Sequence, residues 1–163
     1  MTYDRVADRD ETEAERLDRQ LLELLNEVRV AVPGVQVLFA FLLTVPFTQA
    51  WDDTTDLQRD VYFATLLLTA VATALLLAPS AVHRLLFQRG DKKFIVTLAN
   101  RVTVAGLAAL ALAVTGAVFL VTDVLFDITS AAIAAGCIFG FTLALWYVLP
   151  LSRRFRREAP DRG

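Results

Sequence analysis

Hydrophobic and polar positions are gathered along this chain into long blocks. Four stretches contain no charged residue, at 30–51, 61–82, 102–122 and 128–152. A helix rises ~1.5 Å per residue, so each stretch is long enough to cross a hydrocarbon core of ~30 Å. Backbone groups in lipid must be satisfied within each helix. We therefore predict an all-α membrane protein with four transmembrane helices, at about 30–51, 61–82, 102–122 and 128–150.

The segment before the first span has a different pattern. Its leucines and valines recur at helical spacing and form one apolar stripe, at Leu17, Leu21, Leu24, Val28 and Val32. Asp10 followed by Glu13 fits a capping box, and Pro33-Gly34 is expected to break the helix and let it turn away from the first span. We predict an acidic cytoplasmic segment at 1–29 that contains an amphipathic helix at about 11–32.

The partner of this stripe is left open between two alternatives. The N-terminal segment carries nine acidic residues against five arginines, so anionic lipid should repel it. The helix either docks across the cytoplasmic ends of its own bundle, near the basic loop and tail, or forms a short coiled coil between two copies. Only two to three heptads are available. That length is marginal for a coiled coil and favours docking.

Lys and Arg are distributed unevenly about the spans. Five lie in 1–29, five in 82–101 and five in the tail at 153–163, and Arg59 is the one exception. Positive residues stay on the cytoplasmic side. We expect a multi-pass protein of the bacterial cytoplasmic (inner) membrane with both termini in the cytoplasm.

Some of these cations are expected to contact anionic headgroups. The residues are Arg89, Lys92, Lys93, Arg101, Arg153 and Arg154. In the central loop, Gly90-Asp91 supplies a turn between two short amphipathic pieces. Nucleic acid is not expected as a partner of a basic patch beside a membrane.

Small residues recur every four positions in two of the spans. They are Ala132, Gly136, Gly140 and Ala144 in the fourth, with Ala105, Ala109 and Ala113 in the third. Such spacing lets helix backbones approach closely in lipid. The favoured interpretation is packing of the third and fourth helices within one subunit, and the alternative is a homodimer seam through Gly140.

Prolines punctuate three spans. Pro46 is expected to bend the first helix by removing a hydrogen bond and crowding the Leu42 carbonyl. Pro79 and Pro150 are expected to end or bend the second and fourth helices near the cytoplasmic side.

Catalytic and metal chemistry have little basis in this sequence. Such sites need converging His, Cys or carboxylate side chains. The chain has one His and one Cys, and no span contains a carboxylate. We predict no catalytic, metal or cofactor-binding residue and therefore no enzyme, and we interpret Cys137 as a small buried side chain.

A speculative ion path can be drawn through polar residues near the span ends. It consists of Gln36, Gln49, Asp52 and Asp123. The simpler interpretation is that these are interfacial and loop residues.

The stretch "ETEAERLDRQLLELLNEVRVAVPGVQVLFAFLLTVPFT" at 11–48 resembles a family of small actinobacterial four-helix integral membrane proteins of unknown function. Some members are labelled sodium:proton antiporter. The resemblance implies an integral membrane protein with an acidic amphipathic N-terminus. It supplies no catalytic or binding residues.

The antiporter label conflicts with the residues present. Exchange of Na⁺ for H⁺ normally uses an ionisable carboxylate near the midplane, and every span lacks one. We therefore predict a non-enzymatic scaffold or accessory protein that binds a membrane protein partner. Cation/proton transport by an oligomer is the alternative.

Overall fold

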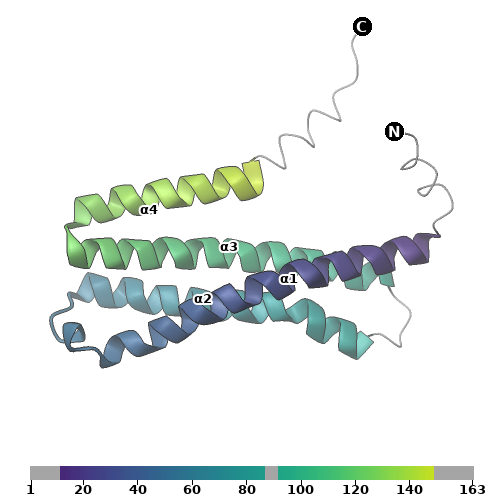
Figure 1. The fold of residues 1–163 in the computed structure, drawn as a ribbon, viewed down its shortest axis with the longest axis horizontal. Coiled ribbons are helices and arrows are strands. Elements are labelled where there is room, and N and C mark those ends of the chain that lie inside the picture. Colours follow the sequence, from purple (N-terminus) through teal and green to yellow (C-terminus); the bar gives the residue numbers. More distant parts are fainter. Residues whose placement is uncertain (1–11, 87–91, 149–163) are drawn as a thin grey trace, which may run out of the picture. The chain divides into compact units, whose positions relative to one another are not determined.

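The computed structural model describes residues 12–86 and 92–148, with the side chains of Ala14, His83, Leu86 and Lys92 left out. Four α-helices make up most of this part of the chain (Figure 1): α1 at Glu13–Thr44, α2 at Asp56–Leu86, α3 at Lys92–Leu125 and α4 at Ile128–Leu143. Two 3₁₀ turns follow α1, at Val45–Phe47 and Gln49–Trp51, and a π-helical turn follows α4 at Ala144–Val148.

Four helical segments are long and apolar enough to cross a membrane, which confirms the prediction of four apolar helices of spanning length. They are Glu15–Phe47, Asp56–Val82, Lys93–Leu125 and Ile128–Val148. The helices α1, α2 and α3 contain 32, 31 and 34 residues, well beyond the ~20 that a bilayer requires. The charged segments that border the charge-free stretches therefore belong to the same helices as those stretches. The two short pieces predicted around Gly90-Asp91 are the end of α2 and the start of α3, and residues 87–91 lie outside the described part.

The start of α1 is capped two residues later than the sequence pattern predicted, at Thr12. The backbone N–H of Thr12 donates to Glu15 Oε2 at 2.9 Å, and the N–H of Glu15 donates to Thr12 Oγ1 at 3.4 Å. This reciprocal pair is a capping box. Glu13 is already helical, and Asp10 lies outside the described residues.

The predicted break at Pro33-Gly34 is wrong, because α1 runs through both residues without interruption. A proline inside a helix removes one hydrogen bond and costs about 3 kcal/mol. On either side of it, Val28 and Val35 are only 4% and 1% exposed. A membrane helix tolerates a proline where neighbouring helices pack against it, and the buried Val28 and Val35 show that α1 is packed on either side of Pro33. The N-terminal segment is thus the first part of α1 and does not turn away from it.

The other two prolines that can be followed also differ from expectation. The α-helical part of α1 ends at Thr44, so Pro46 lies in a 3₁₀ turn and does not bend a continuing helix. Pro79 does not end α2, which continues to Leu86 with the proline fully buried, so of the two expected effects only a bend remains as a prediction. Pro150 lies outside the described residues.

The chain divides into two compact units, which are described separately. Unit 1 consists of Met1–Phe41 and Thr69–Ala108, and unit 2 consists of Leu42–Leu68 and Ala109–Gly163. Each contains part of α1, α2 and α3, and unit 2 also contains α4.

In unit 1, the apolar stripe of α1 packs against the first turns of α3. Leu21, Ile95 and Ala99 form a buried cluster, with Leu24 and Val82 packed against it. Farther along, α2 and α3 approach closely, because a Cβ added at Gly106 would lie 3.0 Å from Leu76 Cγ.

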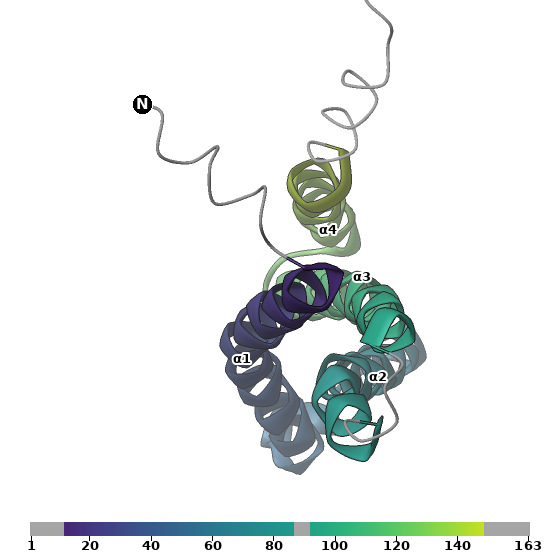
Figure 2. The same ribbon diagram turned by 90° about the vertical axis from the view of Figure 1, so that its right-hand side faces the viewer.

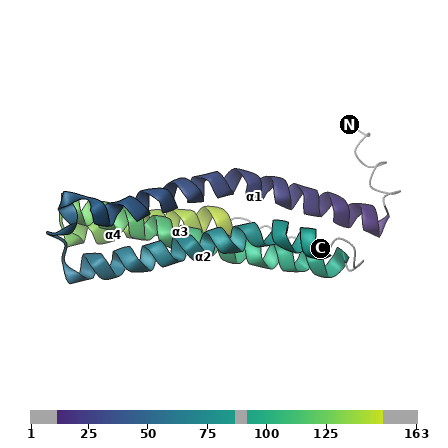
Figure 3. The same cartoon turned by 90° about the horizontal axis from the view of Figure 1, so that it is seen from below.

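In unit 2, α2, α3 and α4 pack through small side chains. Ala113 of α3 and Ala131 of α4 are fully buried, and Ala135 is 8% exposed. Figures 1 and 2 both show α4 alongside α3 in this unit. The end of α1 is joined to α2 by the two 3₁₀ turns (Figure 3).

Candidate functional site

A polar groove runs between α1 and α3 in unit 1. It has a volume of about 430 Å³ and is lined by Gln20, Glu23, Leu24, Glu27, Val96, Thr97 and Asn100. We call it the α1–α3 groove. On α1 the lining residues are three or four positions apart, so they follow one edge of the helix. The Leu21–Ile95–Ala99 cluster fixes the two helices in this arrangement.

The groove has an acidic edge and a neutral edge. Glu23 and Glu27 lie one turn apart on α1, whereas α3 contributes the Thr97 hydroxyl and the Asn100 amide. Arg19 Nη1 contacts Glu23 Oε1 at 3.3 Å, with the two side chains 50% and 59% exposed. An ion pair this exposed contributes about 0–1 kcal/mol and is easily exchanged for another cation. The groove can therefore bind a positively charged group and hydrogen-bond to it.

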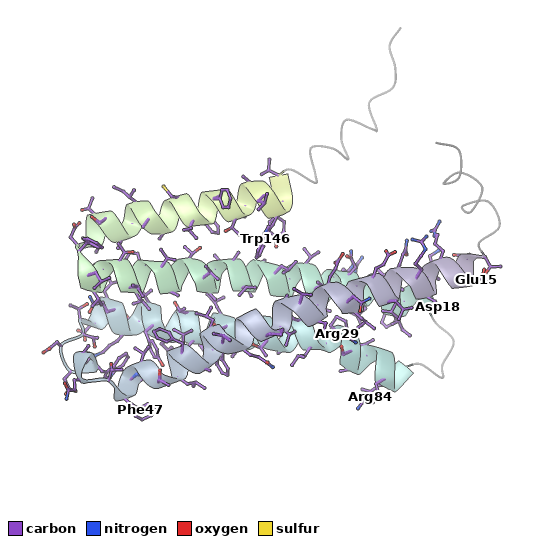
Figure 4. The ribbon with its side chains drawn as sticks, in the orientation of Figure 1. Glu15, Asp18, Arg29, Phe47, Arg84 and Trp146 are labelled. Carbon is purple, nitrogen blue, oxygen red and sulfur yellow. The ribbon has the colours of Figure 1, made fainter. Side chains whose placement is uncertain are left out.

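The apolar stripe of α1, for which the sequence left two possible partners, packs against α3 of the same chain. Leu21 and Val28 are 7% and 4% exposed, and Leu21 packs on Ile95 and Ala99 of α3. The contact runs along the flank of α3, because α1 remains straight enough to lie beside it in this unit. It is not the fold-back across helix ends that the predicted break required. Figure 4 labels Glu15 and Asp18 on the first turns of α1.

The small-residue face of α4 is not the face that packs. Ala132, Gly136, Gly140 and Ala144 are all exposed, and no described atom outside the helix lies within 4 Å of a Cβ added at either glycine. The buried residues are Ala131 and Ala135 instead. The favoured prediction of intrachain packing through Gly136 and Gly140 is therefore wrong. On α3, Ala109 and Ala113 are buried and Ala105 is exposed.

The residues predicted at headgroups are only partly described. Lys93 and Arg101 are exposed at the start of α3. Arg89, Arg153, Arg154 and the Lys92 side chain lie outside the described part of the structure. Arg84 is exposed on the last turns of α2 (Figure 4).

The four residues of the speculative ion path differ in their surroundings. Gln36 is exposed in unit 1, and Gln49 and Asp52 are exposed in unit 2. Asp123 of α3 is partly buried, and its Oδ2 accepts a hydrogen bond of 2.8 Å from Gln58 Nε2 of α2. This carboxylate thus joins two helix ends.

Other candidate chemistry is sparse among the described residues. They contain no group of three or more His, Cys, Asp and Glu side chains that could hold a metal ion. Cys137 is exposed, contrary to the interpretation of a buried side chain. Asp127 caps α4, with Oδ1 accepting from the backbone N–H groups of Thr129 and Ser130 at 2.8 and 3.0 Å. These bonds, first those with Ser130, hold the pKa of Asp127 below its usual range.

Three structural residues were not singled out from the sequence. Tyr62 of α2 is buried, donates to the Leu42 carbonyl at 2.9 Å, and makes an edge-to-face contact with Trp51 at 4.9 Å between ring centroids. Gln58 binds Asp123. Thr103 has a buried hydroxyl with no hydrogen-bond partner among the described residues. A polar residue within an apolar stretch was the available signal for Tyr62 and Thr103, whereas Gln58 lies among charged residues and gave no such signal.

Comparison with known proteins identifies the family. No curated protein and no solved structure matches the chain. A family model described as a family of unknown function, DUF6328, matches residues 10–150, which is most of the chain. The chain belongs to this family of unknown function.

Proposed function

We propose that this protein is a non-enzymatic membrane scaffold that holds a partner protein at the α1–α3 groove. The observation that carries the proposal is the pairing of Glu23 and Glu27 on the acidic edge of that groove. The groove lies on the charged flanks of α1 and α3, outside the charge-free stretches 30–51 and 102–122. A partner can reach it there without entering the lipid.

The chemistry of the groove favours a basic partner segment. With both termini in the cytoplasm of a bacterial inner membrane, the groove opens on the cytoplasmic side. Membrane proteins carry their excess of Lys and Arg on that side. A basic juxtamembrane segment of a neighbouring membrane protein therefore complements Glu23 and Glu27.

Charge reversal tests the groove. We expect Glu27→Lys to reduce recovery of a specific membrane protein that copurifies with the wild-type chain. Glu13→Lys is the matched control, because Glu13 is an exposed acidic residue on the same helix that does not line the groove. Equal recovery with both variants would contradict the proposal.

Within the spans, polar side chains support a structural role. The hydroxyls of Thr65, Thr73 and Thr115 each donate to the carbonyl four residues earlier on their own helix, at 2.7–2.8 Å. Donors used in this way are satisfied within their own helix and are not available to a solute. This use of hydroxyls favours a scaffold over the alternative of cation/proton transport by an oligomer.

A flux measurement separates the scaffold from the transporter. The purified protein in proteoliposomes is expected to give no sodium-driven proton flux at any pH. Flux that is lost in Asp52→Asn or Asp123→Asn would overturn the scaffold proposal.

We further propose that two copies associate through the exposed small-residue face of α4. Exposure of Gly136 and Gly140 supports this, since close backbone contact is what such faces provide in lipid. Replacing both glycines with Ile should abolish the dimer while the monomer stays folded. An unfolded monomer would instead indicate an intrachain role.

Binding of anionic headgroups is proposed for the basic residues at the cytoplasmic ends. The exposure of Lys93 and Arg101 supports it, with about 1 kcal/mol expected per cation near the surface. Thermal stability should rise when anionic lipid replaces zwitterionic lipid. Indifference to lipid charge would contradict this role.

A further inference from the structure

The α1–α3 groove presents hydrogen-bond acceptors on both of its walls. On α1 these are the carboxylates of Glu23 and Glu27. On α3, the Thr97 hydroxyl already donates its proton to the Lys93 carbonyl at 2.8 Å, so its oxygen is left as an acceptor. The side-chain oxygen of Asn100 adds another acceptor on the same wall. An occupant that carries only donors complements this lining.

Most of these polar groups have no partner within the described part of the chain. Arg19 Nη1 contacts one oxygen of Glu23, Oε1, at 3.3 Å. The side chains of Gln20, Glu27 and Asn100 make no hydrogen bond or ion pair with another described residue. They are exposed, so a ligand replaces only water at each of them. The Arg19 contact also shows that a guanidinium can lie on the acidic edge of the groove.

The floor of the groove is apolar and held in place. Leu24 of α1 and Val96 of α3 are the lining residues nearest the core on each helix, and both are half-buried. They pack against the Leu21–Ile95–Ala99 cluster, which fixes their positions. A guanidinium is planar and weakly hydrated, so its face can lie on hydrocarbon, whereas an ammonium group is strongly hydrated. The floor therefore favours a guanidinium.

The arrangement of donors distinguishes arginine from lysine in the same direction. A guanidinium has five N–H donors in a rigid planar fork, directed to more than one side. It can donate to Glu27 on one wall and to Asn100 on the other at the same time. The three donors of an ammonium group leave from a single atom on a flexible stem, and the acidic edge alone can satisfy them.

We propose that the α1–α3 groove binds one arginine side chain of the partner in preference to lysine, an inference that rests on the function proposed above. The guanidinium lies over Leu24 and Val96, between Glu27 and Asn100. The two glutamates attract any cation, whereas Asn100 and the apolar floor provide the selectivity. The basic segment of the partner therefore carries an arginine at the contact.

The experiment compares two small probes on the full chain in an uncharged detergent. N-acetyl-L-arginine amide and N-acetyl-L-lysine amide have the same charge and differ in the cationic group. Their Kd values are measured by saturation-transfer NMR at low ionic strength, because salt screens exposed charges. We expect the arginine amide to bind about fivefold more tightly, which corresponds to about 1 kcal/mol.

Substitutions separate selectivity from charge. Asn100→Leu removes an acceptor but neither carboxylate, so it should weaken the arginine amide to the level of the lysine amide. Asn100→Asp keeps an acceptor there and should keep the preference, and Asn100→Ala serves if Asn100→Leu does not fold. Asn26→Leu is the matched control, because Asn26 is an exposed asparagine of α1 that does not line the groove. Glu27→Gln should weaken both amides.

Three results would overturn the proposal. They are equal Kd values for the two amides, no binding of either amide, and an Asn100→Leu protein that prefers arginine as strongly as Asn26→Leu does. The proposed function is tested separately by recovery of the partner. Equal binding of the amides with partner loss in Glu27→Lys would leave the groove as the partner site without its arginine preference. A preference for arginine with equal recovery by Glu27→Lys and Glu13→Lys would support the arginine site and contradict the scaffold.

Discussion

The hydroxyl of Tyr62 donates a hydrogen bond of 2.9 Å to the carbonyl oxygen of Leu42. In a continuous helix this carbonyl would accept from the backbone N–H of residue 46, and residue 46 is proline. A side chain of α2 thus replaces a hydrogen bond that α1 cannot make. Because Leu42 is 3% exposed and water is excluded there, the replacement matters to stability.

Tyr62→Phe should lower the free energy of unfolding by about 1–3 kcal/mol, because it leaves the Leu42 carbonyl without its partner. The measurement is a denaturation curve of the purified protein in detergent. In a Pro46→Ala background the restored N–H can serve the carbonyl, and the same change should cost less. An equal cost in both backgrounds would contradict this role of Tyr62.

Gly116→Ala should destabilise the protein by about 1–3 kcal/mol, because the new Cβ would overlap Thr65 Oγ1 and force the helices apart. Gly34→Ala is the control. No described atom outside its helix lies within 4 Å of a Cβ there, so alanine should be neutral or stabilising by up to ~1 kcal/mol. Thermal melts of both variants make the comparison, and a similar loss in each would argue against the close approach at Gly116.

Leu21 and Leu22 provide a matched pair on α1. Leu21 is 7% exposed in the cluster with Ile95 and Ala99, whereas Leu22 is 62% exposed. Leu21→Ala should cost about 2–5 kcal/mol in unfolding free energy, and Leu22→Ala less than about 0.5 kcal/mol. If Leu21→Ala instead dissociated an oligomer and left the monomer equally stable, the stripe would be a coiled-coil seam.

Thr103→Val should stabilise the protein by about 1 kcal/mol. The Thr103 hydroxyl is buried without a partner among the described residues, and valine has nearly the same shape without the polar atom. Thr115→Val removes a hydroxyl that donates to the Ala111 carbonyl at 2.8 Å, so it should be neutral or destabilising. In a thermal melt, we expect Thr103→Val to raise the melting temperature and Thr115→Val to lower it or leave it unchanged. A lower melting temperature for Thr103→Val would show that the Thr103 hydroxyl has a partner.

Asp127 should make stability depend on pH at low pH. Its hydrogen bonds to the first turn of α4 hold its pKa below the usual value of 3.8. A carboxyl group with a lowered pKa contributes stability that is fully present above the unfolded-state pKa and is lost as pH falls through the folded-state pKa. The melting temperature should therefore drop below about pH 3.8. Asp127→Asn can still cap the helix but does not titrate, so the part of the drop in melting temperature that Asp127 causes should disappear. The same dependence of melting temperature on pH in Asp127→Asn and in the wild type would contradict this role of Asp127.

The number and nature of the helices could be predicted from the sequence alone. A stretch of about 20 residues without charge is enough for a helix to cross the hydrocarbon core, and this condition is local. It holds at 30–51, 61–82, 102–122 and 128–152 regardless of what each helix touches. The four helical segments of the structure that are long and apolar enough to cross a membrane follow from it.

The helix ends and the effect of the prolines required tertiary contacts. Pro33 is tolerated because α1 packs against a neighbour on either side of it, as the burial of Val28 and Val35 shows. Pro46 could end α1 because Tyr62, 20 residues away in sequence, is available to serve the carbonyl that it leaves. Neither the packing of α1 around Pro33 nor the hydrogen bond from Tyr62 can be recognised from the local sequence pattern.

The buried face of α4 was decided by the tertiary structure in the same way. Ala131 and Ala135 are buried, whereas Ala132 and Gly136, one position later and about 100° around the helix, are exposed. In water an apolar face indicates the core, but in a bilayer lipid and protein both accept apolar and small residues. The sequence by itself therefore determined that α4 is an apolar helix of membrane-spanning length with a small-residue face. Which of two neighbouring small faces is buried depended on how the helices of this unit pack together.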